Sequence, residues 1–227
     1  MKALHDYKAY LFDLDGTLID SASDIATAVN LVREEEGLEP LSLAEVSAEI
    51  GHGAMALIKG CFPYEDLSSL RRIRERFVIA YQSGLCVNTR AMKGAEHCLE
   101  RLALLERRLV LVTNKPRFLG EPLLNDLGWS DRFHLCYYGD TLPLKKPNPL
   151  PILEALKTLE VLASEALFIG DTEVDAEAAQ GAGVDLGLVS FGRAAASVLG
   201  GEWGKSARVV DLEEFAVQLA SLMNTVK

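Results

Sequence analysis

Three aspartates of this chain stand directly after short apolar runs. Asp13 and Asp15 follow the run that starts at Ala9, and Asp171 follows the run Ala166–Ile169. Carboxylate oxygens are ligands that suit Mg²⁺, and an ionised carboxylate beside such a cation can attack phosphorus. Side chains at i and i+2 of an extended segment point the same way, so Asp15 could move the proton that such a reaction requires. The three aspartates therefore favour phosphoryl transfer around a divalent cation.

Polar side chains that could hold a phosphoryl group follow other apolar runs. Thr113 and Asn114 end one such run, and Lys146 stands directly before Pro147 in a loop ahead of a helical stretch. A hydroxyl and an ammonium can bind the non-bridging oxygens of a phosphoryl group. The neighbouring Lys145 is the alternative, and we favour Lys146 because it directly precedes the proline. Thr113 and Asn114 could also cap the next helix. The two roles are compatible, because the backbone N–H groups at a helix start favour anions.

The apolar runs alternate with helical stretches along most of the chain. The predicted strands are Ala9–Leu14, Leu109–Val112, Leu135–Tyr138, Ala166–Ile169, Leu186–Val189 and Arg208–Val210. Strands that alternate with helices predict a mostly parallel sheet covered on both faces, that is, a doubly wound, Rossmann-like α/β core. Ligands of such sheets bind in the crevice at the carboxyl ends of the strands, where the polar side chains described above are expected to meet.

One segment breaks this alternation. Between about Asp20 and Asn88 the sequence carries only helical signals, including a capping box at Ser42–Glu45. An apolar stripe at helical spacing lies in the same segment and consists of Leu70, Ile73, Phe77 and Tyr81. We therefore expect a helical domain of residues 20–88 inserted into a core made of residues 1–19 and 89–227.

Composition and charge limit the partners. The 227 residues are 49% hydrophobic, and 23 basic against 33 acidic side chains give a net charge of −10. A negative chain repels nucleic acids and anionic membrane surfaces, so we expect neither as a partner. No apolar run is long enough to span a membrane, and no signal peptide is recognised. The four cysteines show no metal-binding spacing. These features predict a cytoplasmic protein with a small-molecule ligand, and they carry no prediction of oligomeric state.

The chain resembles the haloacid dehalogenase superfamily in four ordered motifs. They are Asp13-x-Asp15-Gly16-Thr17, Thr113-Asn114, Lys146-Pro147 and Gly170-Asp171-x-x-x-Asp175. The resemblance implies that Asp13 is the nucleophile and Asp15 the general acid/base. It also implies that the helical insert is the small cap domain of that family. Dehalogenating members use no acid/base at the position of Asp15, so its presence favours phosphoryl chemistry on a small phosphorylated metabolite.

The same resemblance implies the roles of the remaining motif residues. Mg²⁺ would be bound by the Asp13 carboxylate, the Asp15 main-chain carbonyl and Asp171. Thr113 and Lys146 would bind the phosphoryl group. Asp175 would orient the metal-binding residues, or bind the cation through a water molecule.

A finer resemblance is to the phosphoglycolate phosphatase group. It rests on the stretch Ile50-Gly51-His52-Gly53-Ala54 and on the loop that runs from Gly139 to Pro149. His52 is a candidate substrate ligand, or alternatively a loop residue between glycines that allow positive φ. The Tyr-Gly-Tyr-like stretch expected after the last core strand is replaced by Ser190-Phe191-Gly192-Arg193.

The group implies Mg²⁺-dependent hydrolysis of 2-phosphoglycolate. Alternatives within the same chemistry are a sugar-phosphate phosphatase, a pyrophosphatase and a mutase similar to β-phosphoglucomutase. A non-catalytic binding or regulatory module on the same fold is the alternative from another class. Such a module would be expected to lack one of Asp13, Asp15 and Asp171, and all three are present.

Overall fold

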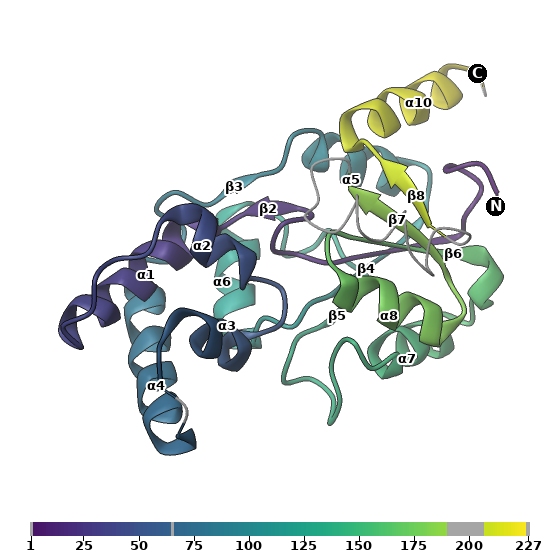
Figure 1. Cartoon of the computed structure of the whole chain (residues 1–227). Helices are drawn as coiled ribbons and strands as arrows, with labels where there is room; N and C mark the ends of the chain where they lie inside the picture. The colour runs from purple at the N-terminus through teal and green to yellow at the C-terminus, as the bar shows by residue number, and fades with distance from the viewer. Residues whose placement is uncertain (1, 65, 190–206, 226–227) are drawn as a thin grey trace.

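The computed structural model describes residues 2–64, 66–189 and 207–225. The stretch Ser190–Arg193 therefore lies outside the described residues. Figure 1 shows two parts, a sheet flanked by helices and a group of helices beside it. None of the described helices combines the length and the apolar character needed to cross a membrane. The cytoplasmic location stays a prediction.

The core is a parallel sheet of six strands in the order β5-β4-β1-β6-β7-β8, and every neighbouring pair is parallel. The strands are β1 (Ala9–Phe12), β4 (Arg108–Val112), β5 (Leu135–Tyr137), β6 (Ala166–Gly170), β7 (Asp185–Val189) and β8 (Ala207–Val210). The predicted doubly wound α/β fold is confirmed. The chain adds strands to one side of β1 and then, from β6 onward, to the other side. The strand order thus reverses around β1, where such sheets bind their ligands.

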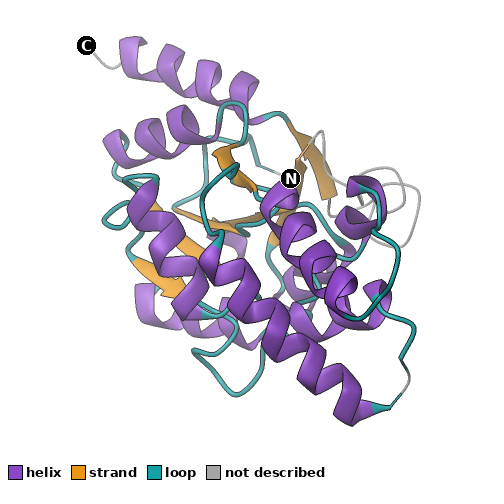
Figure 2. Ribbon diagram, turned by 90° about the vertical axis from the view of Figure 1, so that its left-hand side faces the viewer, coloured by secondary structure: helices purple, strands orange, loops and turns teal. Residues whose placement is uncertain are grey.

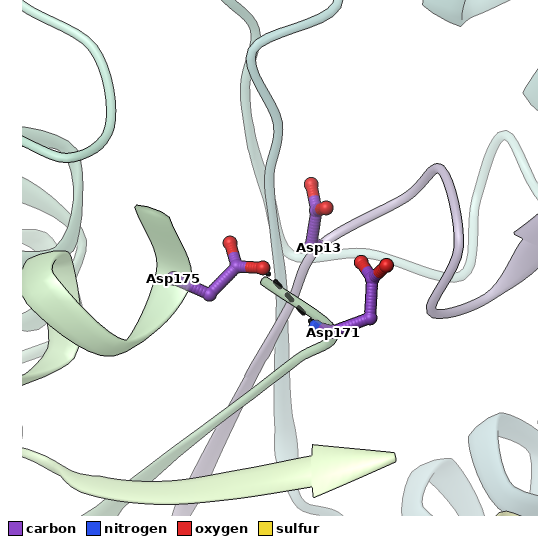
Figure 3. Close-up of side chains that lie close together, drawn as sticks. All are labelled: Asp13, Asp171 and Asp175. Carbon is purple, nitrogen blue, oxygen red and sulfur yellow. Dashed lines mark hydrogen bonds between the residues drawn. The ribbon is translucent and has the colours of Figure 1, made fainter. Parts of the chain in front are cut away.

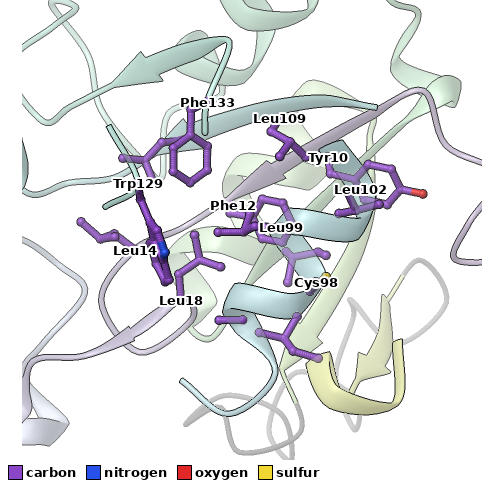
Figure 4. Packing of buried hydrophobic residues seen from close by; sticks show 14 of the residues in the cluster. Tyr10, Phe12, Leu14, Leu18, Cys98, Leu99, Leu102, Leu109, Trp129 and Phe133 are labelled. Carbon is purple, nitrogen blue, oxygen red and sulfur yellow. The ribbon is translucent and has the colours of Figure 1, made fainter. Parts of the chain in front are cut away.

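Helices cover both faces of this sheet. Alternate residues of a strand point to opposite faces, so Tyr10 and Phe12 of β1 belong to one apolar cluster and Leu11 to another. The first cluster, part of which is shown in Figure 4, includes residues of α5 (Ala95–Leu104), α6 (Arg117–Asp126) and α10 (Leu212–Thr225). The second includes residues of α7 (Leu150–Leu159) and α8 (Glu173–Ala182). A short 3₁₀ helix, η1 (Ala163–Glu165), leads into β6.

The first strand ends earlier than the sequence predicts. β1 stops at Phe12, because the Leu14 carbonyl accepts hydrogen bonds from the backbone N–H groups of Leu18 and Ile19 and closes a turn. Gly16 provides the positive φ of 85° within this turn. The prediction of a strand as far as Leu14 is therefore wrong. Turn geometry, rather than strand alternation, positions Asp15.

The inserted segment forms four helices with their own apolar cluster. The helices are α1 (Ala22–Glu35), α2 (Leu43–Ala48), α3 (Ala54–Cys61) and α4 (Leu67–Ser83). The predicted capping box is present at the start of α2, where Ser42 and Glu45 bond reciprocally. The cluster of the insert also contains Leu119 of α6, which joins the insert to the core. Figure 2 views the molecule from the side of the insert and shows its helices in front of the strands.

A short antiparallel ribbon connects the insert to the core, and no sequence pattern predicts it. It pairs β2 (Ile19–Asp20) with β3 (Arg90–Ala91). The Asp24 carboxylate lies beside it and accepts hydrogen bonds from the backbone N–H groups of Asn88 and Thr89, each at 2.9 Å. Two residues per strand are too few to show a hydrophobic period, so the ribbon leaves no pattern in the sequence. The boundary expected after residue 19 falls within β2.

Candidate active site

Three buried carboxylates meet at the carboxyl ends of β1 and β6. Asp13 follows β1, Asp171 follows β6, and Asp175 lies in the first turn of α8. Each side chain offers one oxygen to a group in which all three oxygens lie within 4.8 Å of one another. Figure 3 shows the three side chains, with the backbone of Asp171 bonded to Asp175. The structure thus brings together three aspartates from two separate motifs.

Lys146 lies between two of these carboxylates. Its Nζ is 2.7 Å from Oδ1 of Asp13 and 2.7 Å from Oδ1 of Asp175. Lys146 is buried, whereas the alternative lysine, Lys145, is exposed. Of the two lysines weighed from the sequence, the structure therefore brings Lys146 to the aspartates.

Asp175 makes contacts that position other residues. Its Oδ2 accepts hydrogen bonds from the backbone N–H groups of Asp171 and Thr172 and from the Thr172 hydroxyl. Its Oδ1 accepts a hydrogen bond from Lys146. Both oxygens are therefore engaged, and Asp175 holds the start of α8 and the ammonium of Lys146 in fixed places.

Burial and the neighbouring charges shift the pKa values of this group. Burial raises the pKa of Asp13 to about 8, although the Lys146 ammonium opposes the shift and the carboxylate of Asp175 adds to it. Burial alone would raise the pKa of Asp175, but the Lys146 ammonium and the Thr172 hydrogen bonds lower it below the ordinary range. Burial disfavours the charged form of Lys146, yet Asp13 and Asp175 together raise its pKa. Asp175 and Lys146 therefore form an ion pair, and of Asp13 and Asp175 it is Asp13 whose protonated form is favoured.

Asp15 is held by two residues, Lys115 and Ser21, that belong to none of the four sequence motifs. Lys115 Nζ lies 2.8 and 3.0 Å from the two carboxylate oxygens of Asp15, and the Ser21 hydroxyl donates to one of them. The Lys115 ammonium lies 4.8 Å from the ring centroid of Tyr81 on α4. The only signal in the sequence was the position of Lys115 three residues past the end of β4, at the edge of the sheet where the other polar residues gather.

A cleft of about 520 Å³, including its open mouth, separates the ends of the strands from the insert. Asp13, Asp15, Thr113, Asn114 and Lys115 line its core side. The insert contributes Ile25, Glu49, Ile50, Gly51, Gly53, Ala54, Leu57, Phe77 and Tyr81. The catalytic pair expected from the sequence thus faces one shared space with the helical insert.

The structure shows where the two remaining candidate substrate ligands, Asn114 and His52, lie relative to the aspartates. The Asn114 side-chain amide donates hydrogen bonds to the carbonyls of Gly51 and Lys146, and so ties the insert to the loop that carries Lys146. His52 is exposed and does not line the cleft, although the flanking Gly51 and Gly53 do. The structure therefore does not bring His52 to the aspartates.

The donor set suits a hard divalent cation. The oxygens of Asp13 and Asp171 lie in one buried group, and Thr17 donates a hydrogen bond to one Asp171 oxygen at 3.2 Å. Because both carboxylate oxygens of Asp175 are hydrogen-bonded, one to Lys146 and one to the start of α8, Asp13 and Asp171 are the carboxylates best able to bind a metal. Oxygen-only ligands of this kind match Mg²⁺ rather than a thiolate-binding metal.

The chain belongs to the haloacid dehalogenase-like hydrolases, since the family profile with that description matches residues 10–189. The resemblance expected from the four motifs is therefore confirmed, as is the prediction of an enzyme. Among its curated relatives are proteins named phosphoglycolate phosphatase. The one from Chromobacterium violaceum is 38% identical over 204 residues, which cover 88% of this chain and 92% of the relative. The one from Xanthomonas campestris is 36% identical over 177 residues, which cover 78% and 80%.

Solved structures agree with this assignment. A crystal structure of a predicted phosphoglycolate phosphatase from Haemophilus somnus has a TM-score of 0.78 at 28% identity and covers 84% of this chain and 88% of its own. A haloacid dehalogenase-like hydrolase from Bacteroides fragilis has a TM-score of 0.82 at 26% identity. The match covers 92% of this chain and 99% of that structure's chain. The architecture described above is therefore that of its relatives.

Proposed function

We propose that this protein is a phosphatase that hydrolyses a small phosphate monoester, 2-phosphoglycolate, through an aspartyl-phosphate on Asp13. The observation that carries the proposal is the meeting of Asp13, Asp171 and Lys146 at the point where the strand order reverses, with Asp15 in the adjoining cleft. The substrate is proposed from the relatives, which are named phosphoglycolate phosphatase.

In the first half of the proposed reaction, a carboxylate oxygen of Asp13 attacks the phosphorus atom. The bond between phosphorus and the ester oxygen breaks, and Asp15 donates a proton to the departing oxygen to release an alcohol. Lys146 and Thr113 bind the non-bridging oxygens, and the ammonium offsets their negative charge. Lys146 lies close enough to Asp13 to serve both the attacking carboxylate and the phosphoryl group.

In the second half, a water molecule attacks the phosphorus of the aspartyl-phosphate and gives its proton to Asp15. The bond from phosphorus to Asp13 breaks, inorganic phosphate leaves, and both aspartates return to their starting states. Mg²⁺ would be held by the Asp13 carboxylate, the Asp15 main-chain carbonyl and Asp171. When bound, it supplies positive charge that offsets the repulsion between these carboxylates and the phosphate. Asp175 acts by holding Lys146.

The helical insert serves as a cap in this proposal. Its residues form most of the apolar wall of the cleft, so closing the insert on the core would exclude water from the reacting atoms. Residues 20–88 form the cap domain, and residues 1–19 and 89–227 form the core domain that carries the catalytic groups.

Phosphate release from a panel of phosphomonoesters tests the proposal. The purified protein is assayed with Mg²⁺ and with a chelator on 2-phosphoglycolate, sugar phosphates and pyrophosphate, and kcat/KM is compared. We expect 2-phosphoglycolate to rank first and chelation to abolish turnover. A different leading ester with the same Mg²⁺ dependence would overturn the substrate and leave the chemistry standing. Transfer of the phosphoryl group to a second hydroxyl, rather than to water, would indicate a mutase.

A further inference from the structure

Lys115 is a buried cation that faces the cleft beside the proposed acid/base. It is 7% exposed, and its Nζ lies 2.8 and 3.0 Å from the two oxygens of Asp15. A carboxylate at this distance stabilises the charged form of a lysine, so the Lys115 side chain is an ammonium. The four motifs assign no role to Lys115, and the proposed reaction does not use it.

Lys115 is also the only cationic side chain among the described residues that line the cleft. The other charged lining residues are Asp13, Asp15 and Glu49, and much of the remaining wall is apolar. Lys146 lies among the aspartates and is occupied by Asp13 and Asp175. An anionic group on the ligand, other than its phosphate, would therefore find its opposite charge at Lys115.

One uncharged polar atom of the cleft wall points to the same conclusion. The Tyr81 hydroxyl is buried and makes no hydrogen bond in the structure. A buried polar atom without a partner costs free energy, which a ligand can recover by bonding to it. The Tyr81 ring lies against the Lys115 ammonium, so this hydroxyl belongs to the same part of the cleft. A carboxylate there could accept hydrogen bonds from both side chains.

We infer that Lys115, with Tyr81, binds a carboxylate of the substrate and so selects phosphate esters of short hydroxy acids. This inference rests on the proposed function and extends it to the part of the substrate that does not react. An ammonium has three N–H donors, so Lys115 can keep a hydrogen bond to Asp15 while it donates another to the substrate. One side chain would then hold both the acid/base and the leaving group.

The distances limit the length of the acid. The ester oxygen must lie within about 3 Å of an Asp15 oxygen to take its proton. Lys115 is within 3.0 Å of both Asp15 oxygens, so it is near the ester oxygen as well. In 2-phosphoglycolate, a single methylene separates the ester oxygen from the carboxylate carbon. A short link of this kind keeps the carboxylate within reach of Lys115, and longer acids would have to fold back.

The test compares 2-phosphoglycolate with ethyl phosphate, which has no carboxylate, in the wild type and in Lys115→Met. We expect the variant to lower kcat/KM for 2-phosphoglycolate by about 10²-fold more than for ethyl phosphate, mainly through KM. If Lys115 only positioned Asp15, both esters would lose the same factor, largely in kcat. An unchanged ratio between the two esters would therefore overturn the inference. Lys157→Met, which removes a lysine of α7 that is 77% exposed and does not line the cleft, is the matched control and should leave the ratio unchanged.

Two further measurements keep the test decisive. Calorimetric binding of 2-phosphoglycolate and ethyl phosphate to Asp13→Asn, with and without Lys115→Met, measures recognition without turnover. If Lys115→Met does not fold, Lys115→Arg should retain the preference for the acid, and Tyr81→Phe should lower it several-fold.

A wild type that hydrolyses both esters equally well overturns the inference while the phosphatase proposal stands. A wild type that hydrolyses no ester overturns the proposed function, and the binding measurement then decides on Lys115 alone.

Discussion

Lys146 Nζ lies 2.7 Å from Oδ1 of Asp13, and both groups are buried at the end of the central strand. The lysine comes from a loop 133 positions further along the chain (146 − 13), and the Lys146–Pro147 peptide bond in that loop is cis. A buried ion pair of this kind is weak evidence for stability, because desolvation offsets much of the attraction. Its position against the proposed nucleophile makes function the better explanation.

The first prediction concerns this lysine. Lys146→Met should lower kcat/KM by about 10³-fold, because the phosphoryl oxygens lose an ammonium within a water-poor site. The control is Lys145→Met, which should stay within about threefold of the wild type, as substitutions of exposed residues usually have small effects. Thermal unfolding of both variants separates loss of chemistry from loss of fold. Equal activities of the two variants would contradict the proposed role.

The second prediction concerns the nucleophile. Asp13→Asn should reduce turnover by about 10⁴-fold or more, because an amide is a poor nucleophile. In the wild type, rapid acid quenching during turnover should trap a phosphorylated protein, and peptide mapping should locate the label on Asp13. Label on another residue, or full activity of Asp13→Asn, would disprove the assignment.

The third prediction concerns the contribution of Asp175 to the stability of the fold. Asp175→Ala removes one of the two carboxylate partners of Lys146 and three hydrogen bonds at the start of α8. The free energy of unfolding should fall by about 3–5 kcal/mol, because breaking a buried ion pair is strongly destabilising and the N–H groups at the start of α8 lose their acceptor. Glu177→Ala, at an exposed position of the same helix, should change it by less than about 0.5 kcal/mol. Denaturant titration measures both variants.

Sequence patterns predicted the core and the residues that follow its strands, for reasons that are local. Tyr10 and Leu11 alternate between faces, and Asp13 and Asp171 stand at the ends of continuous apolar runs, so short windows suffice to find them. The contact of Lys115 with Tyr81 could not be predicted in this way. The two residues are on different elements, and they meet only after α4 packs against the core. A short window of sequence contains only one of the two residues, so it cannot show that they are in contact.

A fourth prediction concerns pH and an ion pair on the insert. Arg72 donates hydrogen bonds of 2.7 and 2.9 Å to Glu36 and lowers the pKa of Glu36 to about 2 from an ordinary value of 4.5. A carboxylate with a lowered pKa in the folded state stabilises the fold above its unfolded pKa and loses that effect as the pH falls. The difference in unfolding free energy between wild type and Glu36→Gln should therefore be constant above about pH 5 and shrink toward pH 2.

The control for this prediction is ionic strength. Because Arg72 is about half exposed, added salt should reduce the difference at neutral pH. A difference that stays constant down to pH 2 would mean that the carboxylate charge of Glu36 does not contribute to stability.

The ribbon of β2 and β3 has a consequence for how such enzymes diversify. The chain leaves the sheet and returns to it at adjoining residues, since the Met92 N–H donates to the Leu18 carbonyl at 2.8 Å. A segment attached at two adjoining points can be exchanged for another without displacing the strands that carry Asp13 and Asp171. Recombination could therefore replace the insert as a single unit. Substrate preference would then change with the insert, whereas the residues for phosphoryl transfer would stay in place on the sheet.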